Sequence, residues 1–229
     1  LAHKISSKRT MISVSWSLTR QDHGEQPFWM AIMLASMVGQ IGLPGGGFGF
    51  GYSATNHIGG QFTILPGAAF PQAKNEIENF IPVARISDLL LKPNENFNFD
   101  GKKYKYPDTK IVYWAGGNPF HHHQDLNRLI KAWEKPDTII CNEWCWNTLA
   151  KRSDIVLPCT TPLERKDIMM TPRDPYVVSM SKLVDPYGQA RNDYEIFTGI
   201  AKKMGVEKKF TESRNQDEWQ EWIYNQTFD

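Results

Sequence analysis

Apolar segments of strand length and helix length alternate between residues 110 and 158, and this alternation constrains the fold most strongly. The segments with the length and β-branched content of buried strands are residues 110–114, 138–141 and 154–157. Helices are expected over residues 126–133 and, more briefly, 147–152. This β-α-β-α-β order predicts an α/β fold with a parallel sheet flanked by helices, as in dinucleotide-binding domains, because parallel strands need long crossover connections.

The loop after the first of these strands, residues 114–124 (WAGGNPFHHHQ), combines glycines with asparagine and histidines. Glycine lets the backbone approach a ligand closely, and free N–H groups collect where a helix begins. A strand, this loop and a helix over 125–134 therefore predict an anion site. The loop is neither a Walker A sequence nor the standard dinucleotide fingerprint. A second glycine run, residues 45–51, follows no predicted strand, and its glycines should let the chain pass close to a ligand or another backbone.

The rest of the chain is expected to complete one α/β domain. Residues 10–16 are predicted to form a buried strand and residues 28–40 a helix buried on nearly every face. Residues 1–57 then form one part of the domain, residues 58–109 an irregular insert, and residues 110–229 the main cofactor-binding part. The remaining expected elements are a short helix within 81–92, a type I′ β-hairpin over 97–106 around Asp100-Gly101, a strand over 176–183, and helices over 193–204 and 216–225.

Composition excludes several classes of protein. The 26 basic and 25 acidic residues give a net charge of +1, so the chain lacks the basic surplus typical of proteins that bind nucleic acid or anionic membranes. The longest apolar run, residues 28–37, is too short to span a bilayer. The N-terminus has no apolar segment of a signal peptide and no initiator Met, so we expect a piece of a longer or processed polypeptide. The cysteines, Cys141, Cys145 and Cys159, are expected to be reduced thiols.

Ligands of open parallel sheets bind beyond the carboxyl ends of the strands, and four expected strand ends here carry polar residues. The polar residues at these strand ends could together bind a purine nucleotide with a diphosphate. Arg20 and Arg165 could form bidentate hydrogen bonds with phosphate oxygens, or they could form surface ion pairs. Glu143 or Asp193 could accept the two N–H groups of a guanine edge, although Asp193 could instead cap the helix that follows it.

The other expected ligand contacts lie in the glycine loop, and no catalytic set accompanies them. Asn118 would add a polar donor to those of the glycine backbone, and His122 could bond a phosphate or ribose or remain exposed. Three consecutive histidines point in different directions, so residues 121–123 are not expected to bind one metal ion. No Ser–His–Asp set, nucleophile elbow or paired carboxylate is recognisable. The chain is predicted to hold a cofactor without performing chemistry alone.

Several segments, in order along nearly the whole chain, resemble the dimethyl sulfoxide reductase family of molybdopterin enzymes. They are residues 15–26 (SWSLTRQDHGEQ), 37–49 (MVGQIGLPGGGFG), 113–125 (YWAGGNPFHHHQD), 153–158 (SDIVLP), Glu164-Arg165 and 190–193 (ARND). The resemblance implies a bis(molybdopterin guanine dinucleotide) molybdenum cofactor and reduction of an N-oxide or S-oxide by oxygen-atom transfer. The cofactor contacts that it implies are Trp16, Ser17, Arg20, Asn118, His122, Asn142, Glu143, Arg165 and Asp193.

The resemblance also implies what this chain lacks. It matches the centre of a longer enzyme, so the side chain that binds molybdenum and a C-terminal domain that completes the site would lie outside it. The implied partners are those missing parts, a small oxide substrate and an electron-donor protein, in a soluble enzyme of the bacterial periplasm or cytoplasm. Two alternatives remain open at this point: a plain nucleotide-binding module, and an inactive fragment that holds no cofactor.

Overall fold

The computed structural model describes residues 1–50, 67–72, 74, 77, 79–170 and 176–228. The chain divides into two compact units: residues 1–65 with 173–175, and residues 66–172 with 176–229. Each is described by itself. No helix in the described ranges is both long and apolar enough to cross a membrane.

The first unit is a β-α-β arrangement preceded by a short helix. Strands β1 (Met11–Val14) and β2 (Gly47–Phe50) pair in parallel, and α2 (Gln26–Val38) packs on both. The helix has Pro27 in its first turn and ends at Gly39, whose φ of 69° only glycine adopts easily. The other elements of this unit are α1 (Ala2–Ser7) and the 3₁₀ turn η1 (Trp16–Thr19).

The second glycine run provides β2, a strand that the sequence did not predict. A Cβ on Gly46 would lie 2.9 Å from the carbonyl oxygen of Gln40, and one on Gly47 would lie 3.0 Å from the Cα of Ile41. These glycines therefore allow two backbone segments to pass close to each other. Of the two expected roles, approach to a ligand or to another backbone, the structure shows the second for residues 45–50. Gly51 lies outside the described residues.

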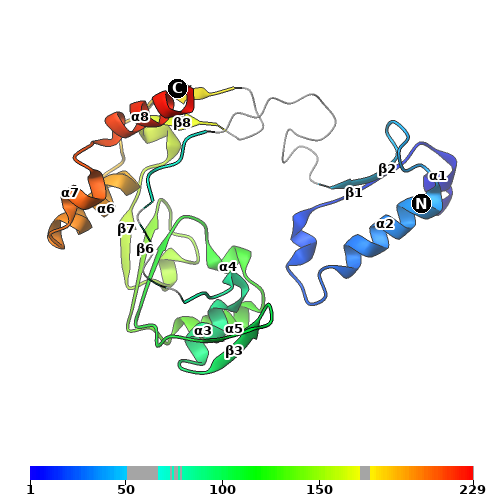
Figure 1. Cartoon of the computed structure of the whole chain (residues 1–229), viewed down its shortest axis with the longest axis horizontal. Coiled ribbons are helices and arrows are strands. Elements are labelled where there is room, and N and C mark those ends of the chain that lie inside the picture. Colours follow the sequence, from blue (N-terminus) through cyan, green and yellow to red (C-terminus); the bar gives the residue numbers. More distant parts are fainter. Residues whose placement is uncertain (51–66, 73, 75–76, 78, 171–175, 229) are drawn as a thin grey trace. The chain divides into compact units, whose positions relative to one another are not determined.

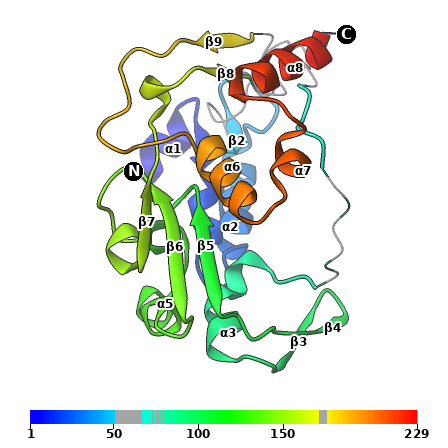
Figure 2. The same cartoon turned by 90° about the vertical axis from the view of Figure 1, so that its left-hand side faces the viewer.

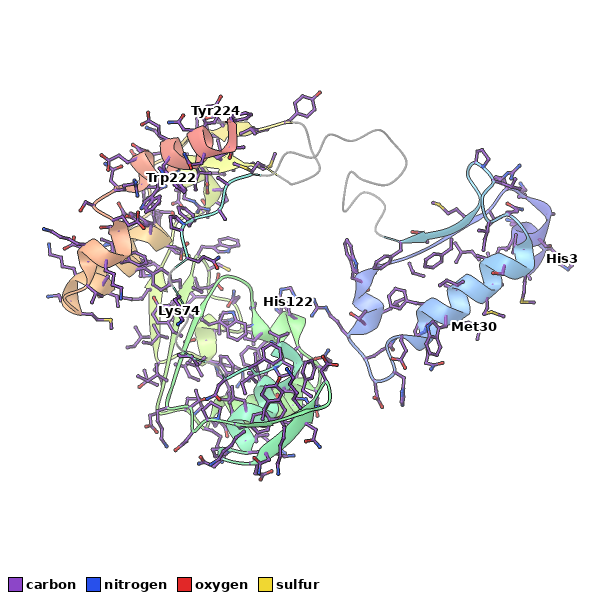
Figure 3. All side chains as sticks on the ribbon, viewed as in Figure 1. His3, Met30, Lys74, His122, Trp222 and Tyr224 are labelled. Carbon is purple, nitrogen blue, oxygen red and sulfur yellow. The ribbon has the colours of Figure 1, made fainter. Side chains whose placement is uncertain are left out.

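The predicted burial of the first strand and of α2 was wrong for this unit. In β1, exposed and half-buried residues alternate, and in α2 only Ala31 and Ala35 are buried. Met30 is 68% exposed and Met37 81% exposed; Figure 3 labels Met30 on α2. The physical reason is that a two-stranded sheet covers one helix face, whereas this sequence is apolar on nearly all of them.

The second unit contains the predicted parallel sheet. Strands β5 (Ile111–Ala115), β6 (Thr138–Glu143) and β7 (Ile155–Pro158) lie in that order, all pointing the same way (Figure 2). Helix α5 (Leu126–Trp133) packs against α3 (Ile86–Leu91) (Figure 1). The Arg128 guanidinium of α5 pairs with the Asp88 carboxylate of α3. The main core lies among these elements: Leu90, Phe120, Leu129, Ala132, Trp133, Ile139, Cys141, Leu149 and Ala150.

The predicted hairpin is also present. Strands β3 (Asn96–Phe99) and β4 (Lys102–Lys105) are antiparallel, and positive φ at both Asp100 and Gly101 agrees with a type I′ turn. The expected helix over 147–152 is only the 3₁₀ turn η3 (Ala150–Arg152). The remaining elements are η2 (Val83–Arg85), α4 (Pro119–His122), η4 (Pro162–Glu164), β8 (Asp167–Met169), β9 (Val178–Met180), α6 (Asp193–Lys203), α7 (Glu207–Thr211) and α8 (Gln216–Phe228).

The described residues place β1 and β2 in a sheet separate from β5, β6 and β7. The expectation that residues 1–57 and 110–229 form one domain around the insert 58–109 remains a prediction.

Candidate cofactor site

A cavity of about 770 Å³ opens where the parallel strands of the second unit end. The register pairs Ala115 with Asn142 and Glu143 with Pro158, so the residues after each strand meet at this edge. Six of the nine residues expected to contact a cofactor line the cavity: Asn118, His122, Asn142, Glu143, Arg165 and Asp193. The convergence of strand ends predicted from the sequence is thus observed for three strands.

The glycine turn forms one wall. Gly116 and Gly117 have φ of 79° and 70°, and no atom lies within 4 Å of a Cβ added to either, so the backbone faces open space. Asn118 is 6% exposed, and its Oδ1 accepts the backbone N–H of Phe120 at 3.0 Å. Its Nδ2 is buried, and no partner for it is found in the described part of the chain. A buried amide without a partner is a polar group available to a ligand.

A short helix that the sequence did not predict follows this turn, and the predicted helix comes after it. Asn118 caps α4, a helix of four residues, whereas α5 begins only after Asp125, whose own carboxylate caps it at 3.2 Å. Pro119 favours a helix start immediately after Asn118, which explains the additional turn. Figure 3 labels His122 in α4. This residue also lines the cavity. Among the described residues, no group of three or more His, Cys, Asp or Glu side chains is placed to bind a metal.

Asn142 connects β5, β6 and α6 beneath the cavity. Its Oδ1 accepts the Tyr113 hydroxyl at 2.7 Å, and its Nδ2 donates to Asp193 Oδ1 at 2.7 Å. Burial, followed by the nearby Asp193 carboxylate, raises the pKa of Tyr113. Asn142 is 3% exposed, and its amide links Tyr113 to Asp193.

Asp193 is the first residue of α6, but it does not cap that helix. Asn192 is the cap, in a reciprocal capping box with Glu195. Backbone bonds from Thr160 to Arg191 and from Arg191 to Pro158, both 3.1 Å, join this segment to the end of β7. The alternative role predicted for Asp193, helix capping, is therefore wrong, and the carboxylate is directed to Asn142 and the cavity.

Both acidic and basic side chains line the cavity. Glu143 is 8% exposed, and its Oε1 accepts the Trp144 backbone N–H at 3.1 Å. Burial, then Asp193, then Glu143 raise the pKa of the Cys159 thiol to about 11. Arg165 donates from Nε to Asp167 at 3.0 Å and from Nη1 to the Thr160 carbonyl at 2.8 Å. Arg165 thus forms the ion pair that was one alternative for it and lines the cavity as well.

The other expected contacts, Trp16, Ser17 and Arg20, belong to the first unit. Trp16 is 48% exposed and meets the edge of the Phe50 ring at 5.3 Å between centroids. The Ser17 hydroxyl bonds that of Ser15 at 2.6 Å, and Arg20 ends the 3₁₀ turn η1. They do follow a strand end, as predicted. That they meet the cavity of the second unit remains a prediction.

Residues that the sequence did not single out as contacts also line the cavity, notably Trp144, Asn147 and Cys159. Their positions in the sequence could have indicated this, because all three follow β6 or β7 at the edge where ligands of such sheets bind.

The family model described as molybdopterin oxidoreductase matches residues 2–203, and the chain belongs to this family. Membership implies a molybdenum–pterin cofactor. The chain is 47% identical over 99% of its length to the biotin sulfoxide reductase of Cereibacter sphaeroides. It is 46% identical over its full length to the trimethylamine-N-oxide reductase of Haemophilus influenzae, and 43% identical over 98% to a dimethyl sulfoxide/trimethylamine N-oxide reductase of Rhodobacter capsulatus.

The chain spans only 29–30% of the length of these relatives. It therefore corresponds to a part of them, as its resemblance to the centre of a longer enzyme predicted. A solved structure, acetylene hydratase from Pelobacter acetylenicus, covers 45% of this chain at 23% identity and a TM-score of 0.41, with 14% of its own length aligned.

Proposed function

We propose that this chain is the central cofactor-binding part of a molybdenum enzyme that reduces an N-oxide or S-oxide by oxygen-atom transfer. Its cavity would hold one guanine dinucleotide arm of a bis(molybdopterin guanine dinucleotide) cofactor. The observation that carries the proposal is the gathering of Asn118, His122, Asn142, Glu143, Arg165 and Asp193 around one cavity at the carboxyl edge of a parallel sheet.

The groups present fit a guanine nucleotide with a diphosphate. The open backbone of Gly116 and Gly117, the unpartnered Asn118 amide and the Arg165 guanidinium suit phosphate oxygens. Glu143 and Asp193 offer carboxylate oxygens to the two N–H donors of a guanine edge. His122 is placed for a phosphate or a ribose hydroxyl.

We assign Trp16, Ser17 and Arg20 to the same cofactor, approached from the first unit. The bound cofactor would supply the metal that accepts the oxygen atom of the oxide and donates the two electrons that reduce it. The residues of this chain bind and orient it, and we assign no molybdenum ligand among them. The rest of the polypeptide, an oxide substrate and an electron-donor protein complete the proposed system.

Calorimetric titration with GDP tests the nucleotide assignment. Wild type should bind, and Arg165→Ala should weaken binding about 10- to 100-fold, the usual value of a hydrogen bond to a charged group. Arg191→Ala is the matched control, because Arg191 is exposed and does not line the cavity. Absence of GDP binding by wild type, or equal losses in both variants, would contradict the assignment.

The activity assigned to the parent enzyme calls for a separate assay. This chain alone should not oxidise reduced viologen in the presence of trimethylamine N-oxide, since we place the molybdenum ligand outside it. Clear turnover by the isolated chain would refute its assignment as an incomplete part.

A further inference from the structure

Trp144 is an exposed aromatic side chain at the cavity that the assigned contacts leave unexplained. It follows Glu143 directly at the end of β6, lines the same cavity and is 66% exposed. None of the ring contacts and cation–π contacts found among the described residues involves Trp144. What distinguishes this indole is that it lines a cavity, where its flat π-face can meet the π-face of a nucleobase.

The neighbouring carboxylate indicates which part of a ligand would meet this indole. The backbone N–H of Trp144 donates to Glu143 Oε1 at 3.1 Å, which ties the carboxylate to the backbone that carries the indole. Glu143 is 8% exposed and is suited to N–H donors, whereas Arg165 and the glycine turn are suited to phosphates. A base whose edge bonds Glu143 would lie beside residue 144, because the two residues are adjacent in the chain.

On the basis of the function proposed above, we propose that Trp144 stacks on the guanine base while Glu143 bonds the edge of the base. Stacking uses the π-face that every base has, so it strengthens binding without choosing among bases. Selection of guanine then rests with the carboxylate, and Trp144 is a positioning residue for the base.

Trp146 provides a matched control, because it is 71% exposed, lies two residues away and does not line the cavity. Wild type, Trp144→Ala, Trp144→Phe and Trp146→Ala are titrated by calorimetry with GDP and, separately, with inorganic pyrophosphate. Pyrophosphate has no base, so it reports on the phosphate contacts alone. Near-ultraviolet circular dichroism checks that each variant is folded.

Trp144→Ala should weaken GDP binding about 5- to 150-fold, the range measured for loss of one base-stacking aromatic, and leave pyrophosphate binding unchanged. Trp144→Phe should retain most of the affinity, and Trp146→Ala should match wild type. Unchanged GDP affinity in Trp144→Ala would overturn the stacking role while leaving the proposed function intact. An equal loss for pyrophosphate would also overturn it, by indicating a structural effect. Failure of wild type to bind GDP would overturn both.

Discussion

Replacing Asn142 with aspartate should destabilise the second unit because it places two carboxylates where an amide now bonds one. Asn142 Nδ2 donates to Asp193 Oδ1 at 2.7 Å, and Asn142 is 3% exposed. In Asn142→Asp this donor becomes a second acceptor. Two unit charges about 4 Å apart repel by about 4 kcal/mol at an effective dielectric constant of about 20, and partial exposure of Asp193 reduces that value.

Asn142→Ala separates the lost bonds from the added charge. It removes the hydrogen bonds to Tyr113 and Asp193, for which we expect about 2 kcal/mol because water reaches both half-buried partners. With the repulsion reduced by the exposure of Asp193 and the lost hydrogen bond added, Asn142→Asp should cost about 4 kcal/mol at pH 7. The added loss should shrink as the pH falls toward about 4, where a proton shared between the two carboxyls removes the repulsion.

Urea unfolding followed by tryptophan fluorescence measures these differences, as shifts in midpoint at constant m-value. The comparison is made at pH 7 and again at pH 4.5 for wild type and both variants. If Asn142→Asp is no less stable than Asn142→Ala at pH 7, or if their difference does not change with pH, the assigned contact with Asp193 is refuted.

Three further predictions concern the walls of the cavity. Gly117→Ala should lower the free energy of unfolding by about 1 kcal/mol, because Gly117 has a φ of 70° although a Cβ would meet no atom there. Gly199→Ala is the control, since Gly199 lies within α6 with equal space and no positive φ, and it should raise the free energy of unfolding by about 0.5 kcal/mol. Thermal melts measure both changes. The pKa of Cys159 is raised to about 11, so its alkylation by iodoacetamide should rise with a midpoint near that pH, and GDP should slow it; a midpoint near 9 would contradict the burial and nearby carboxylates. Asn118→Asp keeps the cap oxygen but replaces the unpartnered amide by a charge, so calorimetry should show weaker binding of GDP and pyrophosphate with little change in melting temperature.

Local patterns predicted much of the second unit. The observed α5 matches the expected helix, and the hairpin turns at Asp100-Gly101 as expected, because helical spacing and turn residues act over a few positions. Five candidate residues that follow predicted strands line one cavity, as expected for ligands of a parallel sheet: Asn118, His122, Asn142, Glu143 and Arg165.

Features that depend on distant contacts were not predicted. The pairing of Arg191 with the end of β7, which directs Asp193 to Asn142, joins segments more than thirty residues apart and leaves no local signal. The strand β2 was missed because glycines are poor strand formers, and only the backbone of Gln40 and Ile41 explains them. The exposure of α2 was missed because periodicity reports which faces are apolar and not what covers them.

The central claim is that this cavity recognises guanine, and a comparison of GDP with ADP tests it most directly. Both carry the same diphosphate, but the adenine edge offers a lone pair where guanine offers a second N–H donor to Glu143 or Asp193. We expect calorimetry on the wild-type chain to give GDP at least about a 10-fold higher affinity, since a mispaired buried polar group costs about 1–3 kcal/mol. Equal affinities, or tighter binding of ADP, would contradict the claim.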